Sequence, residues 1–277
     1  DLNYEPNQIL VSSGGKQSFY NLCQALLNPG DEVIIPAPYW VSYPDMALLA
    51  EAKPVTIETD IEQHLKITPE QLKNAITDKT RLFVINSPSN PTGVAYSKAE
   101  LKALAEVLLD YPDIVIATDD MYEHILWSDE PFSNILNACP ELYDRTIVLN
   151  GVSKAYAMTG WRIGFIGAPE WIAKACTKMQ GQVTSGTNCI AQRATITALE
   201  ESPSKIQYMV EAFKERRKLI LDLLSEIPGI KTNEPEGAFY VFPDVSSFFG
   251  KTIRGTTINT ATDFSLFLLE EALVATV

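Results

Sequence analysis

Lys154 and Arg162 lie eight residues apart in a segment of small and polar residues, 150–164. A lysine amine that its surroundings keep neutral can form a Schiff base with a carbonyl compound. A guanidinium group suits a phosphate dianion, because its fork of N–H donors matches the phosphate oxygens. The pair therefore predicts a site for a phosphate-bearing aldehyde, although two such charges at this spacing are more often ordinary surface residues.

Two other segments end strand-like runs with polar residues that suit the same chemistry. Residues 82–86 lead into a turn with two prolines and a glycine, which holds Asn90 with its amide free to donate. Residues 113–118 stop at Asp119, whose carboxylate could pair with a protonated ring nitrogen. Tyr122 follows three residues later and could hydrogen-bond a phenolate oxygen.

A third segment passes from a strand-like run over 9–13 into Gly14, Gly15 and Lys16, and then into a helical pattern over 19–27. Backbone amides at such a helix start can bind an anion. Each segment has an ordinary alternative: a proline turn, a solvated acid pair or a tight connection. We favour a site because every segment follows a strand-like run, and ligands bind at strand ends in open α/β sheets.

The rest of the pattern predicts an α/β fold, a mostly parallel sheet with helices on both faces. Strand-like runs lie near residues 8–12, 32–35, 54–58, 81–86, 113–118, 145–150 and 162–167. Helical patterns lie near residues 16–27, 40–50, 69–76 and 97–110.

From Pro169 the chain turns helical, with one long helix expected over 205–226. The elements expected after it are short strands at 230–232 and 238–242, a polar loop at 246–259 and a helix at 261–273. We predict two domains, a large one over 1–212 and part of a small one over 213–277.

The composition is that of a globular protein and argues against several kinds of partner. A chain of 277 residues with 46% hydrophobic content can bury one large core and part of a second. The net charge of −13 and the pI near 4.6 argue against nucleic-acid partners and acidic membrane surfaces. No stretch approaches a transmembrane length and no signal peptide is visible, so we expect a cytoplasmic protein.

No metal site is predicted from the cysteines and histidines. Their positions are Cys23, Cys139, Cys176, Cys189, His64 and His124. The four cysteines show no close metal-ligand spacing and are expected to be reduced, and two histidines make a histidine-rich site unexpected.

Taken together, the chain resembles the pyridoxal-phosphate-dependent class I/II aminotransferases of the aspartate aminotransferase family, fold type I, and most of all their bacterial aspartate/prephenate branch. The matching segments are residues 14–17, 37–43, 86–93, 119–122, 153–162 and 237–240. The resemblance implies a three-layer, mostly parallel sheet in the large domain, with part of a small α+β C-terminal domain.

Carried over by residue, the resemblance gives Lys154, Asp119 and Tyr122 as catalytic. Lys154 would hold pyridoxal 5′-phosphate as an internal aldimine and, once freed by substrate, move the proton between Cα and C4′. Asp119 would keep the ring nitrogen protonated, which maintains the electron sink. Tyr122 and Asn90 would share the cofactor's O3′, and Asn90 would also reach the substrate α-carboxylate.

The resemblance also assigns the remaining binding residues. Trp40 would stack on the pyridine face, and the backbone amides of Gly14, Gly15 and Lys16 would bind the phosphate together with Arg162. The Lys16 side chain is a candidate for recognising a distal substrate carboxylate. The predicted substrate-binding residues are thus Trp40, Asn90 and Lys16.

One familiar phosphate ligand is altered in this chain. Many relatives carry a hydroxyl three residues before the lysine, where this chain has Gly151. Ser153 is a candidate substitute.

The resemblance implies a transaminase of amino-acid metabolism that transfers the amino group of aspartate to 2-oxoglutarate, giving oxaloacetate and glutamate, by a ping-pong mechanism. Lys16 and Trp40 favour such an acidic substrate. Prephenate, aromatic or alanine preference, lyase activity, an inactive homologue and a cofactor-binding half of a transcription regulator are the alternatives. Family members are usually homodimers with shared active sites, which we expect here.

Both ends of the chain are expected to be incomplete. Residue 1 is not methionine, and relatives continue beyond residue 277. By resemblance, the preceding part would carry a substrate-gating segment and a tyrosine that reaches the neighbouring subunit's phosphate. The following part would carry the arginine that binds the substrate α-carboxylate. These 277 residues alone are therefore expected to bind cofactor weakly at best.

Overall fold

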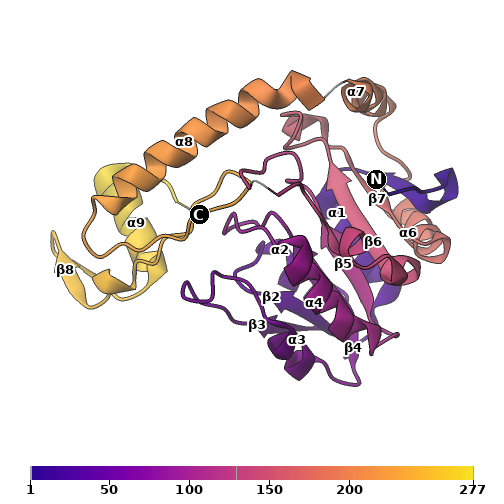
Figure 1. The fold of residues 1–277 in the computed structure, drawn as a ribbon, viewed down its shortest axis with the longest axis horizontal. Helices are drawn as coiled ribbons and strands as arrows, with labels where there is room; N and C mark the ends of the chain where they lie inside the picture. The colour runs from indigo at the N-terminus through magenta and orange to yellow at the C-terminus, as the bar shows by residue number, and fades with distance from the viewer. Residues whose placement is uncertain (1, 129, 202, 277) are drawn as a thin grey trace.

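The computed structural model describes residues 2–128, 130–201 and 203–276. A seven-stranded sheet with the strand order β1-β7-β6-β5-β4-β2-β3 is its main feature (Figure 1). The strands are β1 (Ile9–Ser12), β2 (Glu32–Pro36), β3 (Lys53–Ile57), β4 (Thr80–Asn86), β5 (Val115–Asp119), β6 (Thr146–Gly151) and β7 (Gly164–Gly167). All seven predicted strands are confirmed, with ends shifted by one or two residues.

The sheet is mostly parallel, as predicted. Only β7 runs antiparallel to its neighbours, β1 and β6, among the strands described in this sheet. Its first residues therefore lie at the edge where the parallel strands end, and Gly164 is paired with both Ser12 and Gly151. This reversal brings the segment just before β7 to the same edge as the loop after β6.

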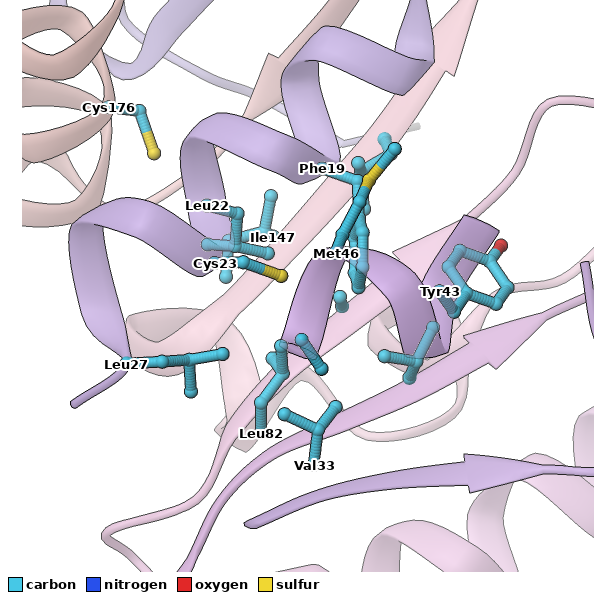
Figure 2. Close-up of a cluster of buried hydrophobic side chains, with 14 of the residues drawn as sticks. Phe19, Leu22, Cys23, Leu27, Val33, Tyr43, Met46, Leu82, Ile147 and Cys176 are labelled. Atoms are coloured by element: carbon cyan, nitrogen blue, oxygen red, sulfur yellow. The ribbon is translucent and has the colours of Figure 1, made fainter. Parts of the chain in front are cut away.

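Helices cover both faces of the sheet, because alternate strand residues point to opposite sides. One face packs against α1 (Gly15–Leu26), α2 (Ser42–Leu49) and α6 (Glu170–Val183). Figure 2 shows Phe19 and Leu22 of α1 with Met46 of α2 above this face. The other face packs against α3 (Pro69–Ala75), α4 (Lys98–Leu109) and α5 (Ile135–Ala138). The expected three-layer α/β fold is confirmed.

The starts of α3 and α4 follow from their sequences. Thr68 caps α3 and Ser97 caps α4, each in a capping box with the residue at the third helical position.

Short 3-10 helices occur at η1 (Pro6–Gln8), η2 (Pro140–Arg145), η3 (Thr159–Trp161), η4 (Pro203–Ile206) and η5 (Ser246–Phe248).

The C-terminal part is built on a long helix. Its elements are α7 (Cys189–Glu200), α8 (Gln207–Ser225), β8 (Lys251–Ile253), β9 (Thr256–Ile258) and α9 (Ala261–Ala272). Figure 1 shows α8 running from the region of α7 to the yellow segment that contains β8 and α9. The long helix expected over 205–226 and the last helix are confirmed. The domain boundary at residue 212 falls inside α8 and stays a prediction.

Two expectations for this part were wrong. The described residues 230–232 and 238–242 form no strands, and only isolated bridges join Lys231 to Asp244 and Leu126 to Gly237. The expected polar loop over 246–259 instead contains the hairpin β8–β9. Its turn uses Arg254 at φ 48° and Gly255 at φ 88°, and two positive φ angles are what a tight hairpin turn requires.

Among the described helices, none combines the length and the apolar character needed to cross a membrane.

Candidate active site

The predicted site residues gather at the carboxyl edge of the sheet. In the register of the strands, Asn86 at the end of β4 pairs with Asp119 at the end of β5, and Asp119 pairs with Leu149 of β6. A pocket of about 160 Å³ opens at this edge. Every predicted site residue except Gly14 lines it, and Gly14 lies directly behind one of its walls.

Lys154 lies half-buried in the turn that follows β6. Its Nζ lies 5.3 Å from the ring centroid of Phe239 and 5.8 Å from that of Tyr122. Burial and, to a lesser extent, the nearby Arg162 guanidinium lower the pKa of the Lys154 amine. A lowered pKa increases the neutral fraction of the amine, which is the form that attacks a carbonyl.

Asp119 is a carboxylate held by hydrogen bonds. The Tyr43 hydroxyl donates to its Oδ2 over 2.6 Å, and the Met121 backbone N–H donates to its Oδ1 over 3.2 Å. Burial raises the pKa of Asp119, and these two hydrogen bonds oppose the rise. No lysine or arginine in the described chain forms an ion pair with it. A cationic ring nitrogen would supply the missing counter-charge.

Tyr122 and Asn90 lie next to each other in the segments that follow β5 and β4. Tyr122 is only 3% exposed, and burial raises the pKa of its phenol, while a hydrogen bond with the Asn90 side chain opposes the rise. The Asn90 backbone N–H donates to Asn86 Oδ1 over 2.7 Å, and Asn86 Nδ2 donates to the Asp119 carbonyl over 2.9 Å. The proline turn is thereby tied to the end of β5.

Gly14 and Arg162 form one wall of the site. Gly14 has a φ of 87°, and a Cβ at this position would meet the Arg162 guanidinium, with Cζ 3.0 Å away. Arg162 itself adopts the left-handed conformation (φ 56°, ψ 53°) between η3 and β7, which is uncommon for a residue with a side chain. Its Nη1 donates to the Thr159 carbonyl over 2.9 Å. The guanidinium is thus held against the start of α1.

Trp40 and Lys16 lie together at the mouth of the pocket. The Lys16 Nζ lies 5.1 Å from the centroid of the Trp40 ring. Trp40 packs edge-on against Tyr43, with the ring centroids 5.3 Å apart. The indole and the Lys16 charge thus lie beside Tyr43, which donates a hydrogen bond to Asp119.

Steric crowding explains the glycine at position 151. A Cβ there would lie 2.9 Å from the Ile163 carbonyl oxygen and 3.2 Å from Gly164 Cα, so no hydroxyl-bearing side chain fits at this position. Ser153 is buried and lines the pocket, and its carbonyl accepts a hydrogen bond from Thr159 Oγ1 over 3.0 Å. Its role as a substitute phosphate ligand stays a prediction.

Three aromatic residues at the site were not selected from the sequence: Tyr43, Phe239 and Tyr240. Tyr43 lies three residues after Trp40, a spacing that places two side chains on one side of a helical turn. Phe239 and Tyr240 come from the far end of the chain and pack on the ring of Tyr122, which lines the pocket. Their only sequence signal was their place in the segment 237–240.

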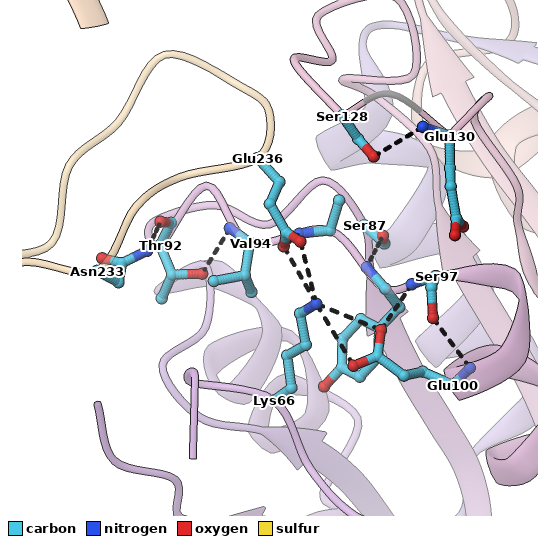
Figure 3. Close-up of polar contacts among 12 residues, drawn as sticks. Lys66, Ser87, Thr92, Val94, Ser97, Glu100, Ser128, Glu130, Asn233 and Glu236 are labelled. Carbon is cyan, nitrogen blue, oxygen red and sulfur yellow. Dashed lines mark hydrogen bonds and ion pairs between the residues drawn. The ribbon is translucent and has the colours of Figure 1, made fainter. Parts of the chain in front are cut away.

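The segment before Phe239 is held by Glu236, which contacts Lys66, Ala95 and Trp127. Lys66 Nζ lies 3.1 Å from Glu236 and 3.3 Å from Glu100 (Figure 3). Ala95 N–H donates to Glu236 Oε2 over 2.9 Å, and Trp127 N–H donates to the Glu236 carbonyl over 2.6 Å. These contacts hold the segment 233–240 beside the loop that follows β4.

Comparison with known proteins agrees with this geometry. Residues 1–277 match the family model described as Aminotransferase class I and II. The chain is 56% identical to the aspartate/prephenate aminotransferase of Nitrosomonas europaea, over 100% of this chain and 70% of the relative. It is 51% identical to that of Cereibacter sphaeroides, over 100% of this chain and 69% of the relative.

Solved structures give the same result. The aspartate aminotransferase from Rhizobium meliloti superimposes with a TM-score of 0.95 at 45% identity, over 99% of this chain and 69% of that one. The aspartate aminotransferase from Thermus thermophilus with maleate gives a TM-score of 0.86 at 39% identity, over 95% of this chain and 70% of that one. The chain therefore belongs to the class I and II aminotransferase family.

Proposed function

We propose that the protein is a pyridoxal-phosphate-dependent transaminase that transfers the amino group of aspartate to 2-oxoglutarate. The observation that carries the proposal is the arrangement of three groups around one pocket: the Lys154 amine with its lowered pKa, the partly buried Asp119 carboxylate and the Arg162 guanidinium. An aldehyde, a ring nitrogen and a phosphate on one molecule would satisfy all three.

The residues present fit this cofactor. The start of α1 at Gly14 and Gly15 and the Arg162 guanidinium would hold the phosphate. Asp119 would hold the ring nitrogen in its protonated form, and Asn90 and Tyr122 would donate to the phenolate oxygen. When bound, pyridoxal phosphate supplies an electron sink for the electron pair released at the substrate α-carbon.

Lys154 would perform the proton transfer. Its Nζ, once released from the cofactor, would accept the proton from the substrate Cα and return it at the cofactor's C4′. Burial and Arg162 lower the pKa of Lys154, which increases the fraction of neutral amine that can act as a base. The rings of Tyr122 and Phe239 flank Nζ, at 5.8 Å and 5.3 Å from their centroids.

Aspartate as the amino donor is supported by two lines of reasoning. Lys16 is exposed at the mouth of the pocket next to Trp40, where its charge could meet a distal carboxylate. The names of the similar proteins include aspartate, and several also include prephenate. Prephenate as a second amino acceptor is therefore the first alternative to test.

The homodimer with shared active sites and the cytoplasmic location are further proposals. Both rest on resemblance to the family.

Transfer of labelled nitrogen tests the proposed function directly. The full-length protein is incubated with pyridoxal phosphate, 2-oxoglutarate and one ¹⁵N-labelled amino acid at a time, aspartate, alanine or phenylalanine, and ¹⁵N-glutamate is measured by mass spectrometry. We expect transfer by the wild type and by Lys178→Ala, which removes an exposed lysine on α6, and none above background by Lys154→Ala. If the label moves from alanine or phenylalanine but not from aspartate, the substrate assignment is wrong. If it moves from no amino acid, the transaminase assignment is wrong.

A further inference from the structure

We propose that Tyr240 is a positioning residue, whose hydroxyl donates to the hydroxyl of Tyr122 and thereby directs the Tyr122 proton toward the phenolate oxygen of the cofactor. The inference rests on the proposed function, which gives Tyr122 its contact with that oxygen. It adds a residue from the C-terminal part of the chain to the cofactor site.

The geometry of the two hydroxyls carries the argument. The oxygens of Tyr122 and Tyr240 lie 2.6 Å apart, and either oxygen can be the donor. Each hydroxyl carries one proton and two acceptor lone pairs. A phenolate oxygen has no proton to give, so a Tyr122 hydroxyl that contacts it must donate. The Tyr122 proton is then used, and the hydrogen bond between the two tyrosines requires Tyr240 to be the donor.

Asn90 strengthens this assignment. A hydrogen bond with its side chain lowers the pKa of Tyr122, which is the effect of an amide N–H that donates to the oxygen. The bond with Tyr240 raises that pKa, so Tyr122 is the donor to Tyr240 until a phenolate oxygen takes up its proton. Once the phenolate oxygen accepts from Tyr122, the bond between the tyrosines reverses, and Asn90 and Tyr240 fill the two acceptor positions of the Tyr122 oxygen. Only its proton remains, and it is free to point into the pocket.

The charged groups near these two hydroxyls are engaged elsewhere. The titratable groups that act on Tyr122 are Tyr240 and Asp119, and Asp119 is itself engaged by Tyr43 and Met121. The Lys154 amine lies over the face of the Tyr122 ring, not at its hydroxyl.

The backbone holds Tyr240 firmly in place. Ala238, two residues earlier, is fully buried and donates its N–H to the Ile125 carbonyl over 2.8 Å. Ile125 follows Tyr122 by three residues, so the two tyrosines are fixed relative to each other through a short stretch of chain. The rings of Phe239 and Tyr240 both pack on Tyr122, with centroids 5.5 Å and 5.7 Å away.

Binding of two ligands to the apoprotein tests the inference without measuring catalysis. The ligands are pyridoxal phosphate and its analogue in which hydrogen replaces the 3-hydroxyl group, and the affinities are measured by spectroscopic titration. The variant is Tyr240→Phe, which removes only the hydroxyl. The matched control is Tyr143→Phe, which removes a tyrosine hydroxyl that donates to the Asn3 carbonyl away from the pocket.

We expect Tyr240→Phe to bind pyridoxal phosphate about fivefold more weakly, as loss of one net hydrogen bond implies, and to bind the analogue as the wild type does. The control should bind both ligands normally. Equal loss for both ligands, or no loss for either, would overturn the inference while leaving the proposed function intact. A wild-type protein that binds no pyridoxal phosphate would overturn the proposed function and this inference with it.

Discussion

Gly164 lies very close to the start of α1. The substitution Gly164→Ala therefore tests the proposal that the wall formed by Gly14 and Arg162 binds the phosphate. A Cβ at this position would lie 2.5 Å from the carbonyl carbon of Gly14 and 2.8 Å from the Cα of Gly15, and it would also meet the Gly15 nitrogen. Optimal contact between carbon atoms needs about 3.5 Å, so the turn must move by about 1 Å. Backbone atoms cannot rotate away as a side chain can.

The displacement has consequences for both stability and binding. Overpacking of this kind costs about 3 kcal/mol, which lowers the Tm by roughly 6 °C in a chain of this size. A shift of ~1 Å also spoils at least one charge-assisted hydrogen bond to the phosphate, which is worth about 2 kcal/mol or roughly 30-fold in affinity. The effect on affinity should be confined to ligands that carry a phosphate.

The assay compares pyridoxal phosphate with pyridoxal, which lacks the phosphate. We expect Gly164→Ala to lose affinity for the first ligand and to bind the second as the wild type does. Gly160→Ala is the matched control, since a Cβ there meets no described atom within 4 Å, and it should behave as the wild type. Wild-type stability and wild-type affinity for pyridoxal phosphate in Gly164→Ala would refute the assignment of this wall.

Three further predictions concern the charges of the molecule. Lys66→Met leaves two carboxylates without the cation, whose side chain is only 13% exposed, and should lower the free energy of unfolding in urea by about 2 kcal/mol. Lys174→Met breaks an exposed ion pair and should lower the free energy of unfolding by less than ~0.5 kcal/mol. Equal losses of stability in Lys66→Met and Lys174→Met would contradict the reasoning. Tyr43→Phe removes a hydrogen bond that favours the ionised form of Asp119, so the pKa of Asp119 rises. When the solution is acidified, the affinity of this variant for pyridoxal phosphate should begin to fall at a higher pH than that of the wild type. If both proteins lost affinity at the same pH, the role of Asp119 would be contradicted. Asp120 has a pKa raised to about 7 by burial, so the native state keeps a proton that the unfolded chain has lost above pH ~4. The contribution of Asp120 to the free energy of unfolding therefore falls as the pH rises toward 7. Asp120→Asn should gain stability relative to the wild type over that pH range. If the two proteins gave parallel curves of stability against pH, the raised pKa of Asp120 would be wrong.

The sheet could be predicted from the sequence because its strands are short apolar runs between helical patterns. Val33 and Ile34 of β2 point to opposite faces, and both are buried, which is why such a run reads as a strand covered on both sides. The hairpin β8–β9 was missed because its residues are polar and largely exposed. The feature that makes the hairpin is its turn at Arg254 and Gly255, where both φ angles are positive. A turn of this kind leaves no pattern of apolar residues in the sequence.

The site could be predicted in part, because most of its residues lie where a strand ends. Residues at or just after the end of a strand, such as Asn90, Asp119 and Lys154, could be placed at the sheet edge from topology alone. Tyr240 could not, because its contact with Tyr122 joins segments 118 residues apart and depends on how the C-terminal part folds back. The sequence shows that position 151 lacks the familiar hydroxyl, but only the structure shows that crowding by Ile163 and Gly164 leaves no room for a side chain there.

Chemical trapping at Lys154 tests the central claim most directly. Borohydride reduces a Schiff base between a lysine and pyridoxal phosphate to a stable amine, and peptide mass spectrometry then locates the modified residue. We predict one predominant adduct, on Lys154, in the wild-type protein and in Lys178→Ala, and its loss in Lys154→Ala. A wild-type adduct spread over surface lysines, or an equal yield of adduct in Lys154→Ala, would contradict the account.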